Sequence, residues 1–128
     1  MLLVKAIMTT DVFTVTLETP VFDTIKIIID KHISGLPVVD NHKKLVGIIT
    51  EKDLLRVLVE GKAGQDKKVK DFMTKSVTSF DEDENVVVVC EYFMNNVVRR
   101  VPIVKDGILV GVVSRRDILK LILEDKGL

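Results

Sequence analysis

The sequence predicts a mixed α/β (α+β) fold made of two β-α-β-β-α repeats that pack about a pseudo-twofold axis. The first observation is internal repetition, because residues 4–9 (VKAIMT) return as residues 69–74 (VKDFMT), a spacing of 65 positions (69 − 4). The second is a stretch with a glycine, two β-branched residues, a hydroxyl and a carboxylate, found at residues 47–53 and again at residues 111–117. One repeat of about sixty residues would bury little surface by itself, so the two sheets should pack together.

The first repeat is expected to alternate strands and helices. β-Branched residues predict a short strand at residues 12–15, and Pro20 can occupy the first turn of the helix that follows. Apolar residues at helical spacing form one core-facing stripe, which comprises Val21, Ile25, Ile28, Ile29 and Ile33. Two further strands are expected at residues 36–39 and 45–50, with a polar turn at residues 40–44 between them.

A second helix should cover residues 51–60, and three of its leucines, Leu54, Leu55 and Leu58, should face inward. The second repeat copies this order, with strands at residues 77–80, 101–104 and 108–114 and helices at residues 85–98 and 116–124. A short, polar segment with glycines joins the two halves. The chain is therefore divided into repeat 1 (residues 1–60), a linker (61–68) and repeat 2 (69–128).

Composition restricts the classes of protein that this chain can represent. Hydrophobic residues make up 47% of the 128 residues and charged residues 30%, so neither a disordered chain nor a membrane protein is indicated. Nineteen basic residues balance nineteen acidic ones, which argues against a broad nucleic-acid-binding surface. The first residues lack the features of a signal peptide, so we expect a cytoplasmic protein. Cys90 is the single cysteine, and we expect a small core residue without a disulfide partner.

The repeated hydroxyl–carboxylate pairs, Thr50 with Asp53 and Ser114 with Asp117, have two interpretations. An ionised carboxylate at the end of a strand can accept hydrogen bonds from the hydroxyls of a sugar. The same spacing is that of a capping box, which only satisfies N–H groups at the start of a helix. A repeated fold repeats its caps as readily as its sites, so both interpretations stay open.

Catalytic and metal-binding patterns are missing from the sequence. It has no Ser-His-Asp or Cys-His arrangement, no glycine-rich phosphate loop and no cluster of metal ligands. His32 and His42 lack metal-ligand spacing with Cys90, and we expect them at a helix end and in a turn. The chain is therefore predicted to be neither an enzyme nor a metal-binding protein.

The last helix carries more apolar residues than one buried face needs, namely Ile118, Leu119, Leu121, Ile122 and Leu123. Surplus apolar surface on a small protein usually marks an interface. We therefore predict a homodimer that uses this helix together with the helical segment from Leu54 to Val59. The alternative is an unusually deep core.

These motifs together resemble a tandem pair of cystathionine β-synthase (CBS) domains, also called a Bateman module. The resemblance depends on the Val-Lys-x-h-Met-Thr segments (h, apolar), the strands that contain Pro37 and Pro102, and the two Gly-h-h-[Ser/Thr]-x-x-Asp stretches. It covers nearly the whole chain, and no further domain is expected, so it implies a stand-alone pair. Such pairs are sensors that bind AMP, ADP, ATP or S-adenosylmethionine as ligands, require no cofactor, and commonly dimerise.

Carried over residue by residue, the resemblance implies two composite clefts that differ in charge. The first would use Thr50 and Asp53 for the ribose, the backbone near Thr78 for adenine, and Lys70, Arg99 and Arg100 toward phosphate. The second would use Ser114 and Asp117 for the ribose, the backbone near Phe13 for adenine, and Ser34 with Lys5 on the phosphate side. Guanidinium groups match phosphate geometry, so the first cleft should bind phosphate more strongly. The second should be weaker, empty or suited to a less charged adenosyl ligand.

The predicted function is a non-catalytic sensor in which an adenosine-containing ligand, with AMP as the first candidate, alters a surface that an effector protein recognises. The alternative is a ligand-free, homodimerising interaction module with degenerate clefts, in which both hydroxyl–carboxylate pairs only cap helices. The acidic run at residues 81–84 has two interpretations. It is either a solvated loop at a helix start or a repulsive element that favours AMP over ATP.

Overall fold

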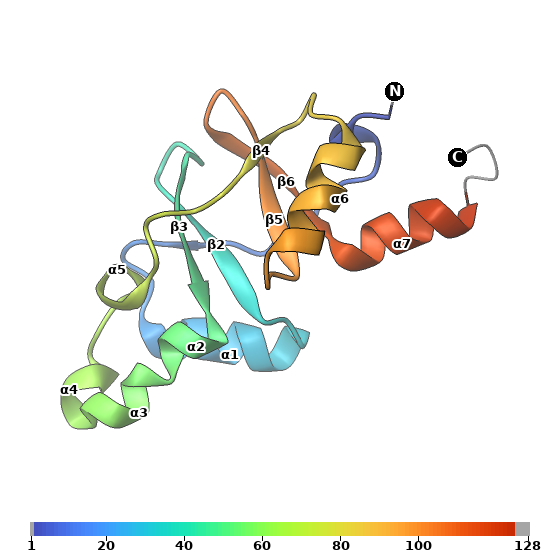
Figure 1. The fold of residues 1–128 in the computed structure, drawn as a ribbon. Coiled ribbons are helices and arrows are strands. Elements are labelled where there is room, and N and C mark those ends of the chain that lie inside the picture. The colour runs from blue at the N-terminus through green and yellow to red at the C-terminus, as the bar shows by residue number, and fades with distance from the viewer. Residues whose placement is uncertain (1, 125–128) are drawn as a thin grey trace. The chain divides into compact units, whose positions relative to one another are not determined.

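The computed structural model describes residues 2–124, which form two compact units with one three-stranded sheet each (Figure 1). Unit 2 is the continuous segment Phe13–Val77, and unit 1 combines Met1–Val12 with Thr78–Leu128. The mixed α+β class predicted from the sequence is confirmed. Within the described residues, no helix has the length and apolar character needed to cross a membrane.

The sheet of unit 2 has the strand order β1-β2-β3. Strand β1 (Val15–Thr16) is parallel to β2 (Gly35–Val39), and β2 is antiparallel to β3 (Leu45–Thr50). Parallel neighbours need a long connection, and helix α1 (Val21–Lys31) supplies it. His32 ends this helix in the left-handed conformation, with a φ of 53°, so its predicted place at a helix end is confirmed.

Short helices follow strand β3 in unit 2: α2 (Glu51–Leu54), α3 (Arg56–Glu60), α4 (Lys62–Gln65) and α5 (Val69–Phe72). The prediction of one helix over residues 51–60 is therefore wrong, because the helix is interrupted at Leu55. Leu54 and Val57 share the buried face, whereas Leu55 and Leu58 are 68% and 87% exposed. The expectation that these two leucines face inward is also wrong.

Unit 1 repeats the topology of unit 2, with the strand order β4-β5-β6. Its elements are β4 (Phe80–Asp81), α6 (Val86–Asn95), β5 (Arg100–Lys105), β6 (Ile108–Ser114) and α7 (Arg115–Glu124), with the 3-10 helix η1 (Val4–Ala6) from the start of the chain. The strands predicted at residues 101–104 and 108–114 are confirmed. The helix predicted at residues 85–98 ends earlier, at Asn95.

The strands predicted at residues 12–15 and 77–80 are wrong in extent. Strands β1 and β4 have two residues each and begin only at the last residue of the predicted segments. Pairing sets these limits, because the parallel ladder of β1 joins only Val15 with Val38 and Thr16 with Val39. The residues before β1 therefore form an irregular segment.

One residue of the stripe predicted for α1 faces solvent. Val21 and Ile28 are buried, but Ile29 is 65% exposed. Thr24 lies on the buried face instead, and its hydroxyl donates to the carbonyl of Pro20 at 3.3 Å. This hydrogen bond is the reason that a threonine is tolerated at a fully buried position.

Each unit has its own hydrophobic core, and each core contains residues that the repeats assign to the other half of the chain. The core of unit 2 includes the fully buried Val69 and the buried Phe72, both from α5. In the core of unit 1 the equivalent position is filled by the fully buried Val4. The two leading segments, residues 4–9 and 69–74, are therefore exchanged between the units.

Backbone contacts hold the exchanged segment of unit 2 in a defined register. The Val69 N–H donates to the carbonyl of Thr19 (2.9 Å), and Thr74 exchanges two hydrogen bonds with Ile48. Gly47 permits this close approach, since a Cβ at that position would lie 2.8 Å from the carbonyl oxygen of Thr74. Unit 1 repeats these contacts with its own residues.

Candidate functional site

The two hydroxyl–carboxylate pairs lie where strands β3 and β6 lead into helices. In unit 2, the Thr50 N–H donates to Oδ2 of Asp53 (3.0 Å), and the Asp53 N–H donates to Oγ1 of Thr50 (3.3 Å). In unit 1, the Ser114 N–H donates to Oδ2 of Asp117 (2.8 Å), and the Asp117 N–H donates to Oγ of Ser114 (3.1 Å). Both pairs are therefore capping boxes, as one of the two sequence interpretations states.

Capping leaves part of each carboxylate available to a ligand. The cap uses Oδ2 in both units, while an ionised carboxylate has about four acceptor positions on its two oxygens. Oδ1 of Asp53 accepts only a long hydrogen bond, from Oγ1 of Thr74 (3.4 Å), and no described donor bonds to Oδ1 of Asp117. Both side chains are partly exposed. Each pair can thus cap its helix and still accept hydrogen bonds from ligand hydroxyls.

Lys70 lies at the far end of the unit 2 sheet from Asp53. The Lys70 N–H donates to the carbonyl of Leu17 (3.1 Å), just beyond the end of β1. Thr50 instead pairs with Gly35, at the start of β2. Since β1 and β2 are parallel, these positions are at opposite ends of the strands. The structure therefore does not bring Lys70 next to the Thr50–Asp53 pair.

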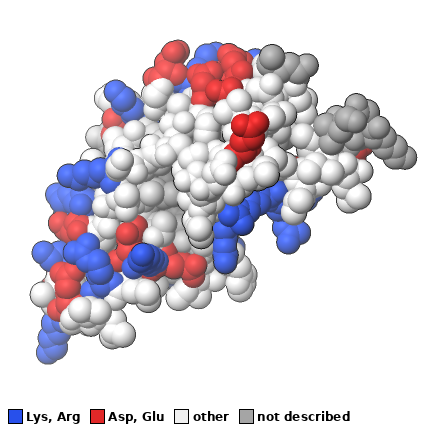
Figure 2. Space-filling model, viewed as in Figure 1, with Lys and Arg blue, Asp and Glu red and all other residues white. Residues whose placement is uncertain are grey.

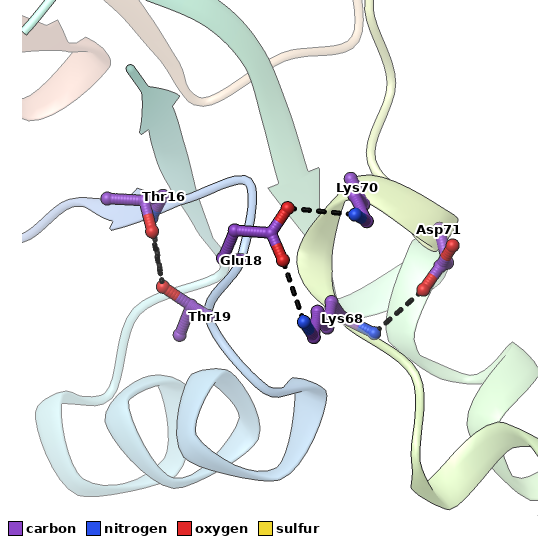
Figure 3. A network of polar contacts seen from close by, with 6 residues as sticks. All are labelled: Thr16, Glu18, Thr19, Lys68, Lys70 and Asp71. Carbon is purple, nitrogen blue, oxygen red and sulfur yellow. Dashed lines mark hydrogen bonds and ion pairs between the residues drawn. The ribbon is translucent and has the colours of Figure 1, made fainter. Parts of the chain in front are cut away.

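Lys70 also has a carboxylate partner in its own unit. Figure 3 shows Glu18 between two lysines, with Nζ of Lys68 at 2.7 Å and Nζ of Lys70 at 2.8 Å from its carboxylate oxygens. The hydrogen bond from Lys68, followed by the one from Lys70, lowers the pKa of Glu18 from 4.5 to about 2. All three side chains are well exposed, so these contacts orient the exchanged segment more than they stabilise it.

We expect the Glu18 contacts to be lost in acid. The pKa of Glu18 is lower in the folded state than in the unfolded state, so its contribution to folding is present above pH 4.5 and disappears as the pH falls toward about 2. Thermal unfolding across this pH range should therefore be less pH-dependent for Glu18→Gln than for the wild type. An NMR titration that gave Glu18 an ordinary carboxyl pKa would contradict the two contacts.

Lys5 occupies the equivalent position in unit 1 and has an equivalent partner. Its ammonium lies 2.8 Å from Asp83, and this hydrogen-bonded contact raises the pKa of Lys5 and lowers that of Asp83. The N–H of Glu82 donates to the carbonyl of Val104, near the end of β5, so the acidic run lies at one end of that strand. The acidic run is thus a turn with local ion pairs, remote within unit 1 from the start of β5.

Arginines gather at the start of β5. Arg100 pairs with Ser114 in the register of the sheet, and the carbonyl of Arg99 accepts a hydrogen bond from the N–H of Arg115 (3.1 Å). Basic side chains form a patch near the start of α7 on the face shown in Figure 2. Among the described residues, no carboxylate forms a salt bridge with Arg99, Arg100 or Arg116. The end of the sheet where β5 begins and β6 ends therefore combines positive charge with the Ser114–Asp117 pair.

The remaining candidates precede strands. Thr78 is exposed just before β4, and Ser34 is half-buried just before β2, where its carbonyl accepts a hydrogen bond from the N–H of Glu51 (2.9 Å). Phe13 precedes β1, and the ammonium of Lys31 lies 5.0 Å from the centroid of its ring. Sequence reasoning missed Lys31, because a lysine in the last turn of a helix is ordinary and gives no signal.

The structure groups the candidate residues by unit. Unit 2 holds Phe13, Ser34, Thr50, Asp53 and Lys70, and unit 1 holds Lys5, Thr78, Arg99, Arg100, Ser114 and Asp117. Each cleft in the sequence-based hypothesis draws residues from both units. The composite clefts therefore stay a prediction.

The repeat, the topology and the paired caps agree with one known family. The CBS domain model matches residues 4–60 and 69–124. The chain belongs to the CBS domain family. The resemblance inferred from the sequence motifs is thereby confirmed, and both CBS domains carry one capping box each.

Relatives and solved structures resemble this CBS pair over most of its length. Inosine-5′-monophosphate dehydrogenase from Methanocaldococcus jannaschii is 46% identical over 111 residues, which are 86% of this chain but 21% of that protein. CBSX2, crystallised in complex with AMP, is 28% identical with a TM-score of 0.86, over 95% of this chain and 96% of that chain. The CBS domain pair of protein MJ0100, in complex with 5′-methylthioadenosine and S-adenosyl-L-methionine, is 35% identical with a TM-score of 0.79, over 94% and 99%.

Proposed function

We propose that this CBS pair is a non-catalytic regulatory module that binds an adenosine-containing ligand, with AMP as the first candidate and ADP, ATP or S-adenosylmethionine as the others. The observation that carries the proposal is the equivalence of the two hydroxyl–carboxylate pairs, each of which keeps a carboxylate oxygen that its helix cap does not need. Two similar CBS pairs support it, because CBSX2 was crystallised with AMP and the MJ0100 pair with two adenosyl compounds.

Asp53 and Asp117 are proposed to hold the ribose. The two hydroxyls of a ribose are neighbouring donors, and one ionised carboxylate can accept both. Backbone N–H groups already fix Oδ2 of both side chains, so the remaining oxygen is oriented before the ligand arrives. Such preorganisation reduces the entropy that binding would otherwise lose.

We assign the phosphate of the ligand to Arg99 and Arg100. Lys5 and Lys70 would have to leave their carboxylate partners to contact phosphate, whereas no described carboxylate forms a salt bridge with the two arginines. The first cleft, which combines Thr50 and Asp53 with the arginines, is proposed as the stronger nucleotide site. The second is proposed to use Ser114 and Asp117 with residues that precede strands in unit 2.

Replacing Arg100 with alanine should weaken AMP binding about tenfold or more, because a charge-assisted contact to phosphate is removed. Adenosine has no phosphate, so its affinity should change little. Isothermal titration calorimetry with both ligands measures the difference. Equal losses for AMP and adenosine would reject the phosphate role of Arg100.

Calorimetry with AMP, ADP, ATP and S-adenosylmethionine tests the proposed function itself. We expect at least one of them to bind and to raise the unfolding temperature, since a ligand that binds only the folded protein stabilises it. Absence of both heat and thermal shift with all four would overturn the proposal. Regulation further requires that an effector protein bind the ligand-bound and ligand-free forms with different affinity.

A second candidate function is a homodimerising interaction module without a ligand. It is favoured by the capping boxes, which account for both hydroxyl–carboxylate pairs without any ligand. It is also favoured by exposed apolar side chains at the end of α2, on α3 and on α7, namely Leu55, Leu58, Val59, Leu119, Ile122 and Leu123. Dimerisation is compatible with either function, so ligand binding distinguishes the two.

We expect the purified chain to form a homodimer through these apolar side chains. Leu58→Glu and Ile122→Glu each place a charge in the proposed interface and should yield monomers. Both side chains are exposed in the single chain, so the variants should keep their folded-state circular dichroism. Size-exclusion chromatography with light scattering measures the mass. A monomeric wild type at micromolar concentration would exclude the interface.

A further inference from the structure

Helix α6 ends without the backbone turn that closes helix α1. The last carbonyls of an α-helix have no partner within the helix, and a residue in the left-handed conformation commonly satisfies them. His32 does so for α1, because its N–H donates to the carbonyls of Ile28 and Ile29. The residue after α6, Asn96, instead has an extended backbone, with φ −139° and ψ 145°. The carbonyls at the end of α6 therefore need donors from side chains.

Side chains supply these donors. The amides of Asn95 and Asn96 each donate to a carbonyl four residues back in the same helix, at 2.9 and 3.0 Å. The guanidinium of Arg115, the first residue of α7, donates to the carbonyls of Phe93 (3.5 Å) and Asn96 (3.2 Å). Arg115 thus joins the end of α6 to a second helix.

Arg115 holds the segment between α6 and β5 at both of its ends. Its backbone N–H donates to the carbonyl of Arg99 (3.1 Å), while its side chain reaches the carbonyl of Asn96. Residues 96–99 form neither helix nor strand, and Val97 is fully exposed, so core packing holds this segment only in part. In Figure 1 the segment lies where the end of α6, the start of β5 and the start of α7 come together.

Unit 2 has the equivalent backbone contact without the side-chain contacts. The residue equivalent to Arg115 is Glu51, 64 positions earlier (115 − 51). The Glu51 N–H donates to the carbonyl of Ser34 (2.9 Å), as the Arg115 N–H does to Arg99. An ionised carboxylate only accepts hydrogen bonds, so the side chain of Glu51 cannot satisfy helix carbonyls. The side-chain contacts of Arg115 therefore belong to the unit that carries Arg99 and Arg100.

We propose that Arg115 is a positioning residue for the arginines assigned to phosphate. This inference rests on the proposed function, since it takes Arg99 and Arg100 to contact the phosphate of the ligand. Arg115 fixes the backbone that leads to these two residues before a ligand binds. Its planar guanidinium presents several N–H donors in a fixed arrangement, and its charge is favourable at the carbonyl end of a helix. The guanidinium is itself engaged with two carbonyls, so Arg99 and Arg100 meet the phosphate.

Arg115→Ala tests this role by calorimetry with AMP and with adenosine. Without the guanidinium, AMP binding has to order the segment, so the Kd for AMP should rise about tenfold. Adenosine has no phosphate, so its Kd should stay unchanged. Arg115 is exposed, and the variant should therefore keep its fold. Equal changes for the two ligands, or no change for AMP, would overturn the inference.

Two control variants separate positioning from stability and from charge. Asn95→Ala removes a hydrogen bond at the same end of α6 and leaves the contacts of Arg115 in place, so it should cost similar stability and keep the Kd for AMP. Arg116→Ala removes an equal charge, but within residues 2–124 its side chain donates to neither carbonyl, so it should raise the Kd for AMP less. An effect as large as that of Arg115→Ala in either control would overturn the role of Arg115.

Amide hydrogen exchange without ligand gives a second measurement. The Val98 N–H donates to the carbonyl of Asn96 (3.0 Å), and its exchange should accelerate in Arg115→Ala. Arg115→Lys keeps a charged donor and should restore part of both the protection and the AMP affinity. Unchanged exchange at Val98 in Arg115→Ala would overturn the positioning role. If the wild type binds no adenosine compound, the proposed function fails and this inference with it. If the wild type binds AMP and Arg115→Ala binds it equally well, only the present inference fails.

Discussion

Replacing Phe72 with alanine should lower the free energy of unfolding by about 3–5 kcal/mol. Phe72 is 3% exposed and belongs to the core of unit 2, beside the fully buried Val69. Removing the ring leaves a cavity that the surrounding sheet and helices can fill only in part. Unfolding in urea or guanidinium chloride measures the loss.

The strands that the Phe72→Ala substitution destabilises show whether Phe72 supports the compact unit or the sequence repeat to which it belongs. By sequence, Phe72 belongs to the second CBS domain (residues 69–124). By packing, it belongs to unit 2, which otherwise consists mainly of the first CBS domain. Amide hydrogen exchange in Phe72→Ala should therefore accelerate in β2 and β3 and stay unchanged in β5 and β6. Phe22→Ala, at an exposed position, should change stability by less than about 0.5 kcal/mol. Acceleration confined to β5 and β6 would show that Phe72 supports the second repeat instead.

The regular elements could be predicted because their signals are local. Strands β3 and β6 coincide with the predicted segments 45–50 and 108–114, since apolar β-branched runs bounded by turns leave few alternatives. The exchange of residues 4–9 and 69–74 could not be predicted. Both segments share one pattern and would fit either unit, so chain connectivity and long-range pairing decide the choice.

In the candidate site, too, contacts between residues close in sequence could be predicted, and contacts between distant residues could not. The partners in the Thr50–Asp53 and Ser114–Asp117 pairs are three residues apart, so the motif itself predicts that they meet, and both pairs form. Glu18 and Lys70 are far apart in sequence, and only the exchanged segment brings them together. The contact between Phe13 and Lys31 likewise spans the whole of β1 and α1 and leaves no periodic signal.

Asp53→Ala should weaken binding of an adenosine ligand by about 1–3 kcal/mol, which corresponds to roughly 5–150-fold in Kd. The variant removes the carboxylate oxygen that is proposed to accept hydrogen bonds from the ribose. Adenosine and AMP share the ribose, so both should lose the same factor, in contrast to Arg100→Ala. Calorimetry with adenosine and with AMP measures the change in Kd for each ligand.

The loss of a helix cap must be separated from the loss of a ligand contact. Asp53 caps α2, so the variant should also lose about 1 kcal/mol of stability. Asp71→Ala is the matched control, because Oδ2 of Asp71 accepts the N–H of Lys68 (2.9 Å) at the start of α5 without a hydroxyl partner. It should lose comparable stability and keep its ligand affinity. If both variants lost affinity in proportion to stability, the carboxylate would act only as a cap, and the ribose assignment would be rejected.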